Sequence, residues 1–456
     1  MKREGKASRT VNFNARTLAL VALMLSTDHL PAQMTVREAI EIALRHNPQI
    51  LASAARVTAA QEGVNLARSQ FYPRVDFSAT YREQAPEVSF RLPPVIGGAP
   101  GEITVIPHSY REFNLQLVQP VYTGGKLEAA YRVARCAASA AELGHANTTL
   151  QLVKRIRHAY LDVLEAEALV EVADAAIKRV QEMRRVVGLM FEAGRVAKFD
   201  VLRVEAELAQ AHDELVRAQN ALEIARSAFN TLLARDVNAP VELVKVTEPP
   251  KQPEELACED AEEISLEIAK AQRPDLKAAM RSVELAEQKV KLAESERMPS
   301  ISLATAFRRQ TRTGFASAES KAAMLIIQAP IFDSGRVNAQ VEQARAELRS
   351  AKEILSSIEN QIALEVRQAV LNWRSAQGRF KAAIAVLDGA EEAYRIAMLR
   401  YEAGVGTNVE VLDAQAALTR ARTNYVRALH DLHRAVADFE YAIGKPVERV
   451  LSELGQ

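Results

Sequence analysis

Apolar residues recur along two long stretches of this chain at alternating steps of four and three positions. The first series starts at Leu152, and the second starts 210 residues later at Ile362. This spacing places apolar side chains on one stripe of an α-helix and is typical of a coiled-coil seam. Each stretch is therefore predicted to be a long helix that packs along this stripe. The following seam positions are Ile156, Ala159, Val163, Ala166, Val170, Ala173, Ile177 and Val180, then Val366, Ala369, Trp373, Ala376, Phe380, Ala383, Leu387 and Ala390.

Each long stretch leads to a glycine-bearing break and then to a second seam. The first break contains Gly194, and the second contains Gly404 and Gly406. Glycine commonly ends a helix in the left-handed conformation. Each half is therefore predicted to be a helical hairpin, whose rising arm in the first half runs from about Gly125 to Gly194 and spans on the order of 100 Å. The returning seams are Val204, Leu208, Ala211, Leu215, Ala218, Leu222, Ala225, Phe229 and Leu232, then Ala414, Leu418, Ala421, Tyr425, Ala428, Leu432, Ala435, Phe439 and Ala442.

A shorter helix is predicted earlier in each half, from Pro48 to Phe71 and from Pro274 to Met298. The returning arm, of about forty residues, is shorter than the rising arm by roughly the length of this helix. We therefore expect the short helix and the returning arm to lie end to end beside one long helix.

Apolar and polar residues alternate directly after Pro73, which is the period of a β-strand with one apolar face. Its expected partner runs from about Glu112 to Tyr122, and the second half supplies Ile301 to Phe307 and about Ala322 to Phe332. The fold class is therefore mainly α with a β portion of four strands. The apolar positions of the first strand are Val75, Phe77, Ala79 and Tyr81.

Strands of around ten residues suit a membrane-spanning barrel, in which every strand edge must be paired because lipid cannot hydrogen-bond the backbone. Four strands cannot close such a barrel. Other copies of the chain must then supply the rest, which gives eight strands in a dimer or twelve in a trimer. The alternative is a small soluble sheet that caps a coiled coil.

The two halves are copies of one unit. FEAGRVAKFDVL at 191–202 aligns with YEAGVGTNVEVL at 401–412, whereas nearer the start of each half the shift is 226 residues. The difference locates an insertion in the first copy between Pro73 and Pro120. Because residues 85–109 hold five prolines and three glycines, we expect an exposed loop there, without strands.

This duplication sets the predicted organisation of the chain. Basic residues before the apolar run Leu18–Leu25 are typical of a secretory signal peptide, and this run is too short to span a membrane. The predicted segments are a signal peptide at 1–32, a first repeat at 33–239, a linker at 240–260, a second repeat at 261–445 and a C-terminal tail at 446–456.

Charge and composition exclude several classes of function. Lysine and arginine total 58 residues, and aspartate and glutamate total 58, so the chain lacks the basic excess of a nucleic-acid-binding protein. Beyond the first segment the sequence has no long uncharged apolar stretch, which excludes a helical inner-membrane transporter. Cys136 and Cys258 do not correspond between the copies, so we expect neither a disulfide nor a zinc site.

Catalytic and cofactor motifs are also missing from the sequence. His430 and His433 lie three positions apart on a predicted helix, but no third metal ligand is evident nearby. Gly404-Val405-Gly406 lacks the third glycine of a phosphate-binding loop. Neither Gly-x-Ser-x-Gly nor a pair of catalytic acids in a pocket is present. We therefore expect a protein that is not an enzyme and binds no cofactor or metal.

The duplicated hairpins, the glycine-bearing tips and two strand-to-helix breaks together resemble the TolC family of outer-membrane efflux proteins. The breaks carry Pro120 and Gly125 in the first copy and Pro330 and Gly335 in the second. The resemblance covers nearly all of the chain after residue 32. It implies a homotrimer with a twelve-stranded barrel in outer-membrane lipid and a helical tunnel across the periplasm. It also implies a periplasmic adaptor and an inner-membrane pump as partners, while the exported substrate is not implied.

The segment from Val409 to Ala414 resembles the acidic aperture motif of that family. Glu410 and Asp413 are three residues apart, so they share a helical face just inside the second tip. In a trimer they could place up to six carboxylates around one constriction, which would favour cations. Asp200 and Arg203 occupy the equivalent places in the first copy. The alternative is two solvated acids beside a turn.

The hairpin tips are the expected contacts for an adaptor. The simpler interpretation of these residues is favourable turn chemistry. The competing function is a periplasmic coiled-coil adaptor or scaffold without a pore, although such proteins usually carry one hairpin rather than two. The tip residues are Phe191, Gly194, Arg195, Val196 and Ala197, then Tyr401, Gly404, Val405, Gly406 and Thr407.

Overall fold

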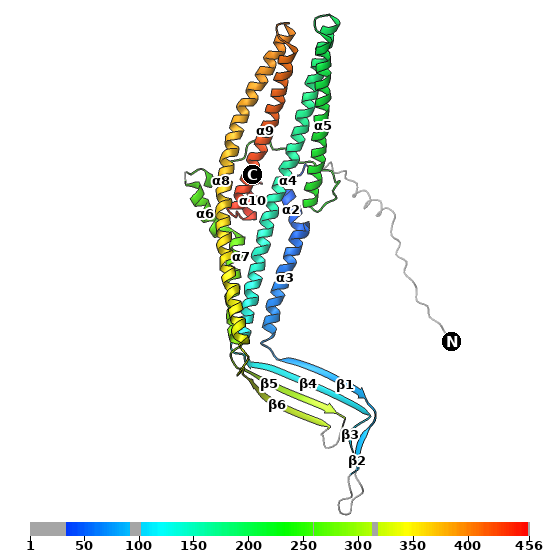
Figure 1. The fold of residues 1–456 in the computed structure, drawn as a ribbon, viewed down its shortest axis with the longest axis vertical. Helices are drawn as coiled ribbons and strands as arrows, with labels where there is room; N and C mark the ends of the chain where they lie inside the picture. Colours follow the sequence, from blue (N-terminus) through cyan, green and yellow to red (C-terminus); the bar gives the residue numbers. More distant parts are fainter. Residues whose placement is uncertain (1–32, 92–101, 259, 312–317, 455–456) are drawn as a thin grey trace, which may run out of the picture.

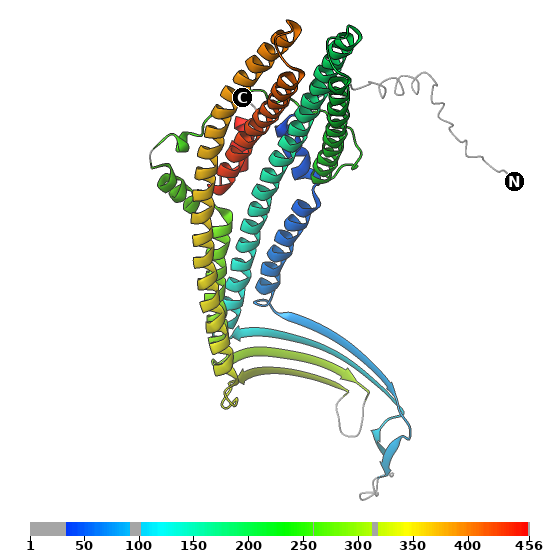
Figure 2. The same cartoon turned by 45° about the horizontal axis from the view of Figure 1, so that its top comes forward.

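A computed structural model describes residues 33–91, 102–258, 260–311 and 318–454. The predicted signal peptide, residues 1–32, lies outside the described residues. The protein is elongated, with long helices at one end and a curved sheet at the other (Figures 1 and 2). Among the described residues, no helix is both long enough and apolar enough to cross a bilayer.

Two helical hairpins of equal size form the helical part, as the duplication predicts. The first consists of α4 (Lys126–Glu192) and α5 (Lys198–Leu232), and the second of α8 (Arg336–Glu402) and α9 (Asn408–Ala442). Both rising helices have 67 residues, and both returning helices have 35. Each long helix therefore extends for about 100 Å.

The hairpin tips turn at glycines in the left-handed region. Gly194 has a φ of 70° and Gly404 a φ of 78°, which residues with a Cβ adopt only with strain. Each glycine follows the C-cap of its long helix and continues the chain into a short connection. The glycines therefore located the second turn correctly. Only Gly404 ends the second long helix in the left-handed conformation, because Gly406 does not have a positive φ.

The short helices lie where their lengths predicted. α3 (Pro48–Ser69) continues below α5 along α4, and α7 (Pro274–Ser295) lies below α9 along α8 (Figure 1). Both have 22 residues and begin with proline at the first helical position, where the missing N–H costs no hydrogen bond.

The predicted seams form the helical core. Ile156, Val163 and Val180 of α4 are fully buried, as are Ile362 and Val366 of α8. Toward the second tip the seam residues of α8 are less buried, and Ala383, Leu387 and Ala390 are only half-buried.

The strands form one antiparallel sheet in the order β1, β4, β5, β6. Their bounds are Arg74–Glu83, Ser109–Tyr122, Ser300–Gln310 and Glu319–Gln328. β1 and β6 are thus the two edges of the sheet within one chain. β6 ends before Pro330, so the expectation that it reaches Phe332 was wrong, because proline cannot donate to the ladder.

The insertion in the first copy contains strands, contrary to expectation. β2 (Val88–Arg91) pairs with β3 (Glu102–Ile106), and this ribbon projects beyond the sheet (Figure 1). Pro86 and Pro107 flank the ribbon instead of interrupting it, so they remove no bond from its ladder. The expectation of a loop without strands was therefore wrong for these residues.

In the part of the chain that the structure describes, three further helices surround the middle of the helical part: α2 (Val36–His46), α6 (Ala261–Gln272) and α10 (Val447–Glu453). Thr35 and Glu38 form a reciprocal capping box at the start of α2. A short 3₁₀ turn, Glu254–Leu256, precedes α6. Ile40 of α2 and Val450 of α10 belong to the buried cluster formed with α4 and α5, so α2 and α10 pack against the middle of the first hairpin.

Candidate functional site

Glu410 lies in the first turn of α9 and is held there by Thr407. The Glu410 amide donates to Thr407 Oγ1 over 3.3 Å, and the Thr407 hydroxyl donates to Glu410 Oε1 over 3.2 Å. The other carboxylate oxygen lies 3.9 Å from Arg400 Nη2, and the Glu410 side chain is 46% exposed. Arg400 therefore balances part of its charge.

Asp413 lies one turn further along α9 and is exposed. Within the part of the chain that the structure describes, it forms no ion pair. The geometry thus places one partly balanced and one free carboxylate just inside the second tip, on the same side of the helix.

The equivalent residues of the first tip have another arrangement. Asp200 Oδ2 accepts a hydrogen bond from the Ala197 amide over 3.2 Å, which caps α5. Among the described residues, Asp200 and Arg203 form no ion pair with each other. The two copies therefore differ here in contacts as well as in sequence.

A link between the tips was not predicted from the sequence. The Asn408 side-chain amide donates to the main-chain oxygen of Asp200 over 3.3 Å, and Asn408 is buried. From the sequence, only the neighbouring Thr407 could be assigned a role, because it is the N-cap of α9. An asparagine at the first helical position has no such local role, so only the fold reveals its function.

The predicted tip residues divide into a buried and an exposed set. Tyr401 is buried in an apolar cluster that also contains Val187 of α4 and Val411 of α9. Phe191 and Val405 are exposed, Val405 to 70%. Phe199 of α5, which sequence reasoning missed, is 67% exposed. The tips therefore present large apolar side chains to their surroundings.

The strand-to-helix breaks also differ in chemistry between the copies. After Pro330, the Asp333 carboxylate accepts hydrogen bonds from the amides of Gly335 and Val337 over 3.0 and 2.9 Å and caps α8. Before α4, by contrast, the Leu127 amide donates to the Thr123 hydroxyl over 3.4 Å.

An exposed apolar belt lies beside these breaks. Its members are Val121, Tyr122, Ile331 and Phe332, of which Ile331 is 93% exposed. Pro120 lies just before the first pair and Pro330 just before the second, while Gly125 and Gly335 begin the helices with φ values of 87° and 84°.

The sheet has one apolar and one polar face. Cross-strand partners such as Val75 and Leu117, or Leu303 and Leu325, fall on the same face. All four side chains occupy odd-numbered positions, and the exposed Phe77 joins them. Even-numbered positions form the other face, which includes Asp76, Gln116, Asn114, Ser302 and Arg308. The alternation predicted for β1 thus continues on β4 and β5, whereas β6 also carries the apolar Met324 and Ile326 at even-numbered positions.

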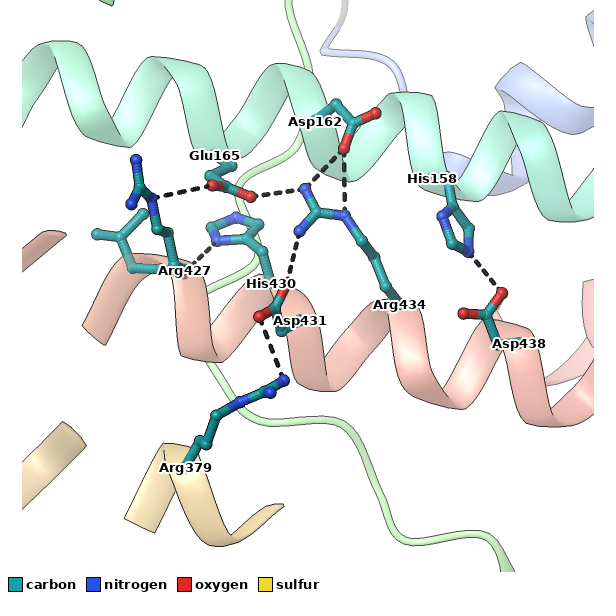
Figure 3. A network of polar contacts seen from close by, with 10 residues as sticks. His158, Asp162, Glu165, Arg379, Arg427, His430, Asp431, Arg434 and Asp438 are labelled. Atoms are coloured by element: carbon teal, nitrogen blue, oxygen red, sulfur yellow. Dashed lines mark hydrogen bonds and ion pairs between the residues drawn. The ribbon is translucent and has the colours of Figure 1, made fainter. Parts of the chain in front are cut away.

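Ion pairs join the two copies along α4 and α9 (Figure 3). Arg434 Nη2 lies 2.6 Å from both Asp162 Oδ1 and Glu165 Oε2, and Arg434 Nη1 lies 3.1 Å from Asp431 Oδ1. Burial would lower the pKa of Arg434, but Glu165 and Asp162 outweigh this effect and raise it. Arg427 also approaches Glu165, at 3.8 Å.

The same interface continues toward the sheet. Asp438 Oδ1 lies 2.9 Å from His158 Nε2 and 2.9 Å from Lys154 Nζ. Glu440 pairs with Arg157 and Lys445. Burial would raise the pKa of Asp438 and Glu440, but their hydrogen-bonding and ion-pair partners hold both pKa values below their usual range. These contacts fix α9 of the second copy to α4 of the first.

His430 and His433 do not point at a common ligand. Each donates a ring hydrogen to a main-chain oxygen, His430 to Val426 over 2.8 Å and His433 to Glu248 over 2.9 Å. Among the described residues, no group of three or more potential metal ligands is present. Cys136 and Cys258 are free thiols.

Comparisons with known proteins cover most of the chain. A family model described as outer membrane efflux protein matches residues 39–235 and 266–445. Protein CyaE of Bordetella pertussis is 25% identical over 398 residues, which are 86% of this chain and 80% of that protein. Outer membrane protein TolC of Vibrio cholerae is 25% identical over 413 residues, 88% of this chain and 89% of that protein. The crystal structure of outer membrane protein VceC from Vibrio cholerae covers 90% of this chain and 96% of its own, with a TM-score of 0.75 and 20% identity.

Proposed function

This chain belongs to the outer membrane efflux protein family, and from that premise we propose that it forms the passive exit duct of a tripartite efflux or type I secretion system. The protein resides in the outer membrane, with its helical part in the periplasm. The proposed duct is a homotrimer in which three sheets close one barrel and the hairpins of three chains enclose one tunnel.

The observation that carries this proposal is the sheet with two unlike faces and two free edges. Its apolar face suits contact with lipid, and its polar face suits a water-filled lumen. Within the described residues of one chain, β1 and β6 each have a neighbour on one side only. Because hydrocarbon cannot satisfy the free backbone groups, β6 of one chain is proposed to pair with β1 of the next. Three chains then supply twelve strands.

The proposed entrance lies at the hairpin tips. Glu410 and Asp413 of three chains would place up to six carboxylates around the constriction, and such a ring favours cations. The exposed apolar residues Phe191, Phe199 and Val405 fit contact with a periplasmic adaptor, because apolar side chains at the end of a soluble hairpin gain from burial. An inner-membrane pump would then supply the energy for export.

Extraction from outer membranes tests this function. We expect a detergent-soluble trimer that resists dissociation until it is heated, and that conducts ions after insertion into a planar bilayer. A freely water-soluble monomer would contradict the duct and support a coiled-coil adaptor or scaffold instead. The Phe199→Ser and Val405→Ser double variant should still form the trimer but should lose crosslinking to the adaptor.

A further inference from the structure

The polar face of the sheet carries an unequal set of charges. The four strands place three arginines there, Arg74, Arg82 and Arg308, but only two carboxylates, Asp76 and Glu112. Both carboxylates are engaged by an arginine. Arg74 Nε lies 2.7 Å from Asp76 Oδ2, and Arg308 Nε lies 2.9 Å from Glu112 Oε1. One positive charge is therefore left over in each chain.

That charge belongs to Arg82. Within the residues that the structure describes, Arg82 has neither an ion-pair partner nor a side-chain hydrogen bond, and it is exposed. Its cross-strand partner is Tyr110. The Tyr110 hydroxyl lies 3.1 Å from Glu112 Oε2, so the Glu112 carboxylate on this face already interacts with both Tyr110 and Arg308. Glu112 is thus shared among neighbours and does not balance Arg82.

Arg82 also has a defined height in the duct. It is the second-last residue of β1, at the end of the sheet farthest from the helices (Figure 2). Because the helices lie in the periplasm, this end of the barrel faces the outside of the cell. A symmetric trimer would place three unpaired guanidinium groups at the same height around the lumen.

We propose that Arg82 forms a cationic ring near the outer mouth of the barrel, which favours the passage of anionic solutes. This inference rests on the proposed function. Fixed charges that line a narrow, low-dielectric passage concentrate ions of the opposite sign. The outer mouth and the acidic tip would then have opposite preferences, because Glu410 and Asp413 favour cations. The measured ion selectivity of the whole duct would combine both effects.

Arg111 provides a matched control on the other face of the sheet. It is the cross-strand partner of Tyr81, the residue next to Arg82, and its guanidinium carbon lies 5.7 Å from the centre of the Tyr81 ring. Arg111 therefore has nearly the same height as Arg82 but belongs to the face that points away from the lumen. Neutralising Arg111 removes the same charge without changing the lumen.

The test is the reversal potential of single channels in a planar bilayer under a potassium chloride gradient. The background is the Glu410→Gln, Asp413→Asn double variant, in which the acidic tip no longer contributes. In this background we expect a preference for chloride that is lost with Arg82→Gln, kept with Arg82→Lys and unchanged with Arg111→Gln. Heat-modifiable trimers of each variant establish that the barrel has formed.

Two results would overturn the inference. Equal reversal potentials for the background and its Arg82→Gln derivative would show that Arg82 does not select ions, while the duct itself would stand. A folded wild-type trimer without any conductance would contradict the proposed function and this inference with it.

Discussion

The side-chain amide nitrogen of Asn408 lies 3.3 Å from the main-chain oxygen of Asp200, and this hydrogen bond joins the first turn of α9 to the first turn of α5. The two residues belong to different copies of the repeat. The bond therefore fixes the position of Glu410, two residues further along α9, relative to the first hairpin. Together with the apolar cluster around Tyr401, it joins the two tips into one unit.

Loss of this bond should loosen the tips. A hydrogen bond of this kind contributes about 0.5 to 1.5 kcal/mol, so Asn408→Ala should speed amide hydrogen exchange in the second turns of α5 and α9 by about 2- to 10-fold. Asn424→Ala on the exposed side of α9 is the control and should leave these rates unchanged. Equal exchange in the Asn408→Ala variant and the wild type would mean that the apolar cluster alone holds the tips.

Arg273 should be the most sensitive charged residue in the second copy. Its buried side chain lies 2.5 Å from both Asp275 and Glu365 and packs against Gly444, whose added Cβ would come within 2.9 Å of Arg273 Cγ. Burial would lower the pKa of Arg273, but the two carboxylates outweigh it and raise the pKa. Arg273→Met leaves both carboxylates without this partner and should cost about 3 kcal/mol.

Thermal unfolding in detergent measures this loss. For a chain of this size we expect the midpoint to fall by about 3 °C. Arg281→Met is the matched control, because Arg281 pairs with Glu284 at 2.6 Å on the surface and such pairs contribute about 0 to 1 kcal/mol. A midpoint for Arg273→Met as high as that of the control would show that the buried pair is dispensable.

Acidification should destabilise the protein through His430. Burial lowers the pKa of this imidazole, although its hydrogen bond to Val426 and the charge of Glu165 act in the opposite direction, while Arg434 adds to the lowering. With a folded pKa below the ordinary 6.5, the neutral form contributes stability above that value, and this stability is lost as the pH falls toward the folded pKa.

We therefore expect the unfolding midpoint of the wild type to fall between pH 7.5 and pH 5.5, and to fall less in His430→Leu. His212 is exposed on α5, so His212→Leu should retain the wild-type slope. Identical slopes for the wild type and His430→Leu would assign the pH dependence to other groups. Asp438 and Glu440 act at lower pH, because their pKa values lie below 3.8 and 4.5, respectively.

Periodicity alone was sufficient to predict the long helices and the sheet. Ile156 and Ile362 lie in seams whose spacing repeats over many turns, and both are buried. Val75 and Phe77 alternate with polar neighbours and form an exposed apolar face of the sheet. The ribbon β2–β3 was not predicted, because the number of prolines in this segment does not show where they lie relative to the paired residues. Pro86 and Pro107 lie outside the paired residues.

Contacts between the copies could not be read from the sequence. Arg434 and Asp162 are 272 positions apart, and each occurs on a helix with many other charges, so no local feature selects this pair. The same holds for Asn408, whose partner is a main-chain atom. The candidate acids Glu410 and Asp413 were singled out because the segment around them resembles the acidic aperture motif of the TolC family and their spacing places them on one helical face; their orientation toward a pore is a proposal.

Neutralising the tip acids should change ion selectivity. Glu410→Gln with Asp413→Asn removes two carboxylates per chain, and we expect the reversal potential under a salt gradient to shift away from cation preference. Glu448→Gln, which is exposed on α10 away from the tips, should leave the potential unchanged. An unaltered potential in the double variant would place these acids outside the conducting path.

The central claim is that one chain supplies only part of a barrel, and disulfide trapping between the free strand edges tests it. The background replaces the native thiols by Cys136→Ala and Cys258→Ser. Ser78→Cys on β1 is then combined, one at a time, with cysteine at β6 positions of the same polar face. These positions are Ser320, Ala322 and Met324.

The most direct measurement is the size of the oxidised product on a nonreducing gel after full denaturation. The account predicts that at least one pair links β1 of one chain to β6 of another and yields covalent trimers, while Ser78→Cys alone yields monomers. Disulfides confined within single chains, or products that stop at dimers in every combination, would contradict the proposed trimeric barrel.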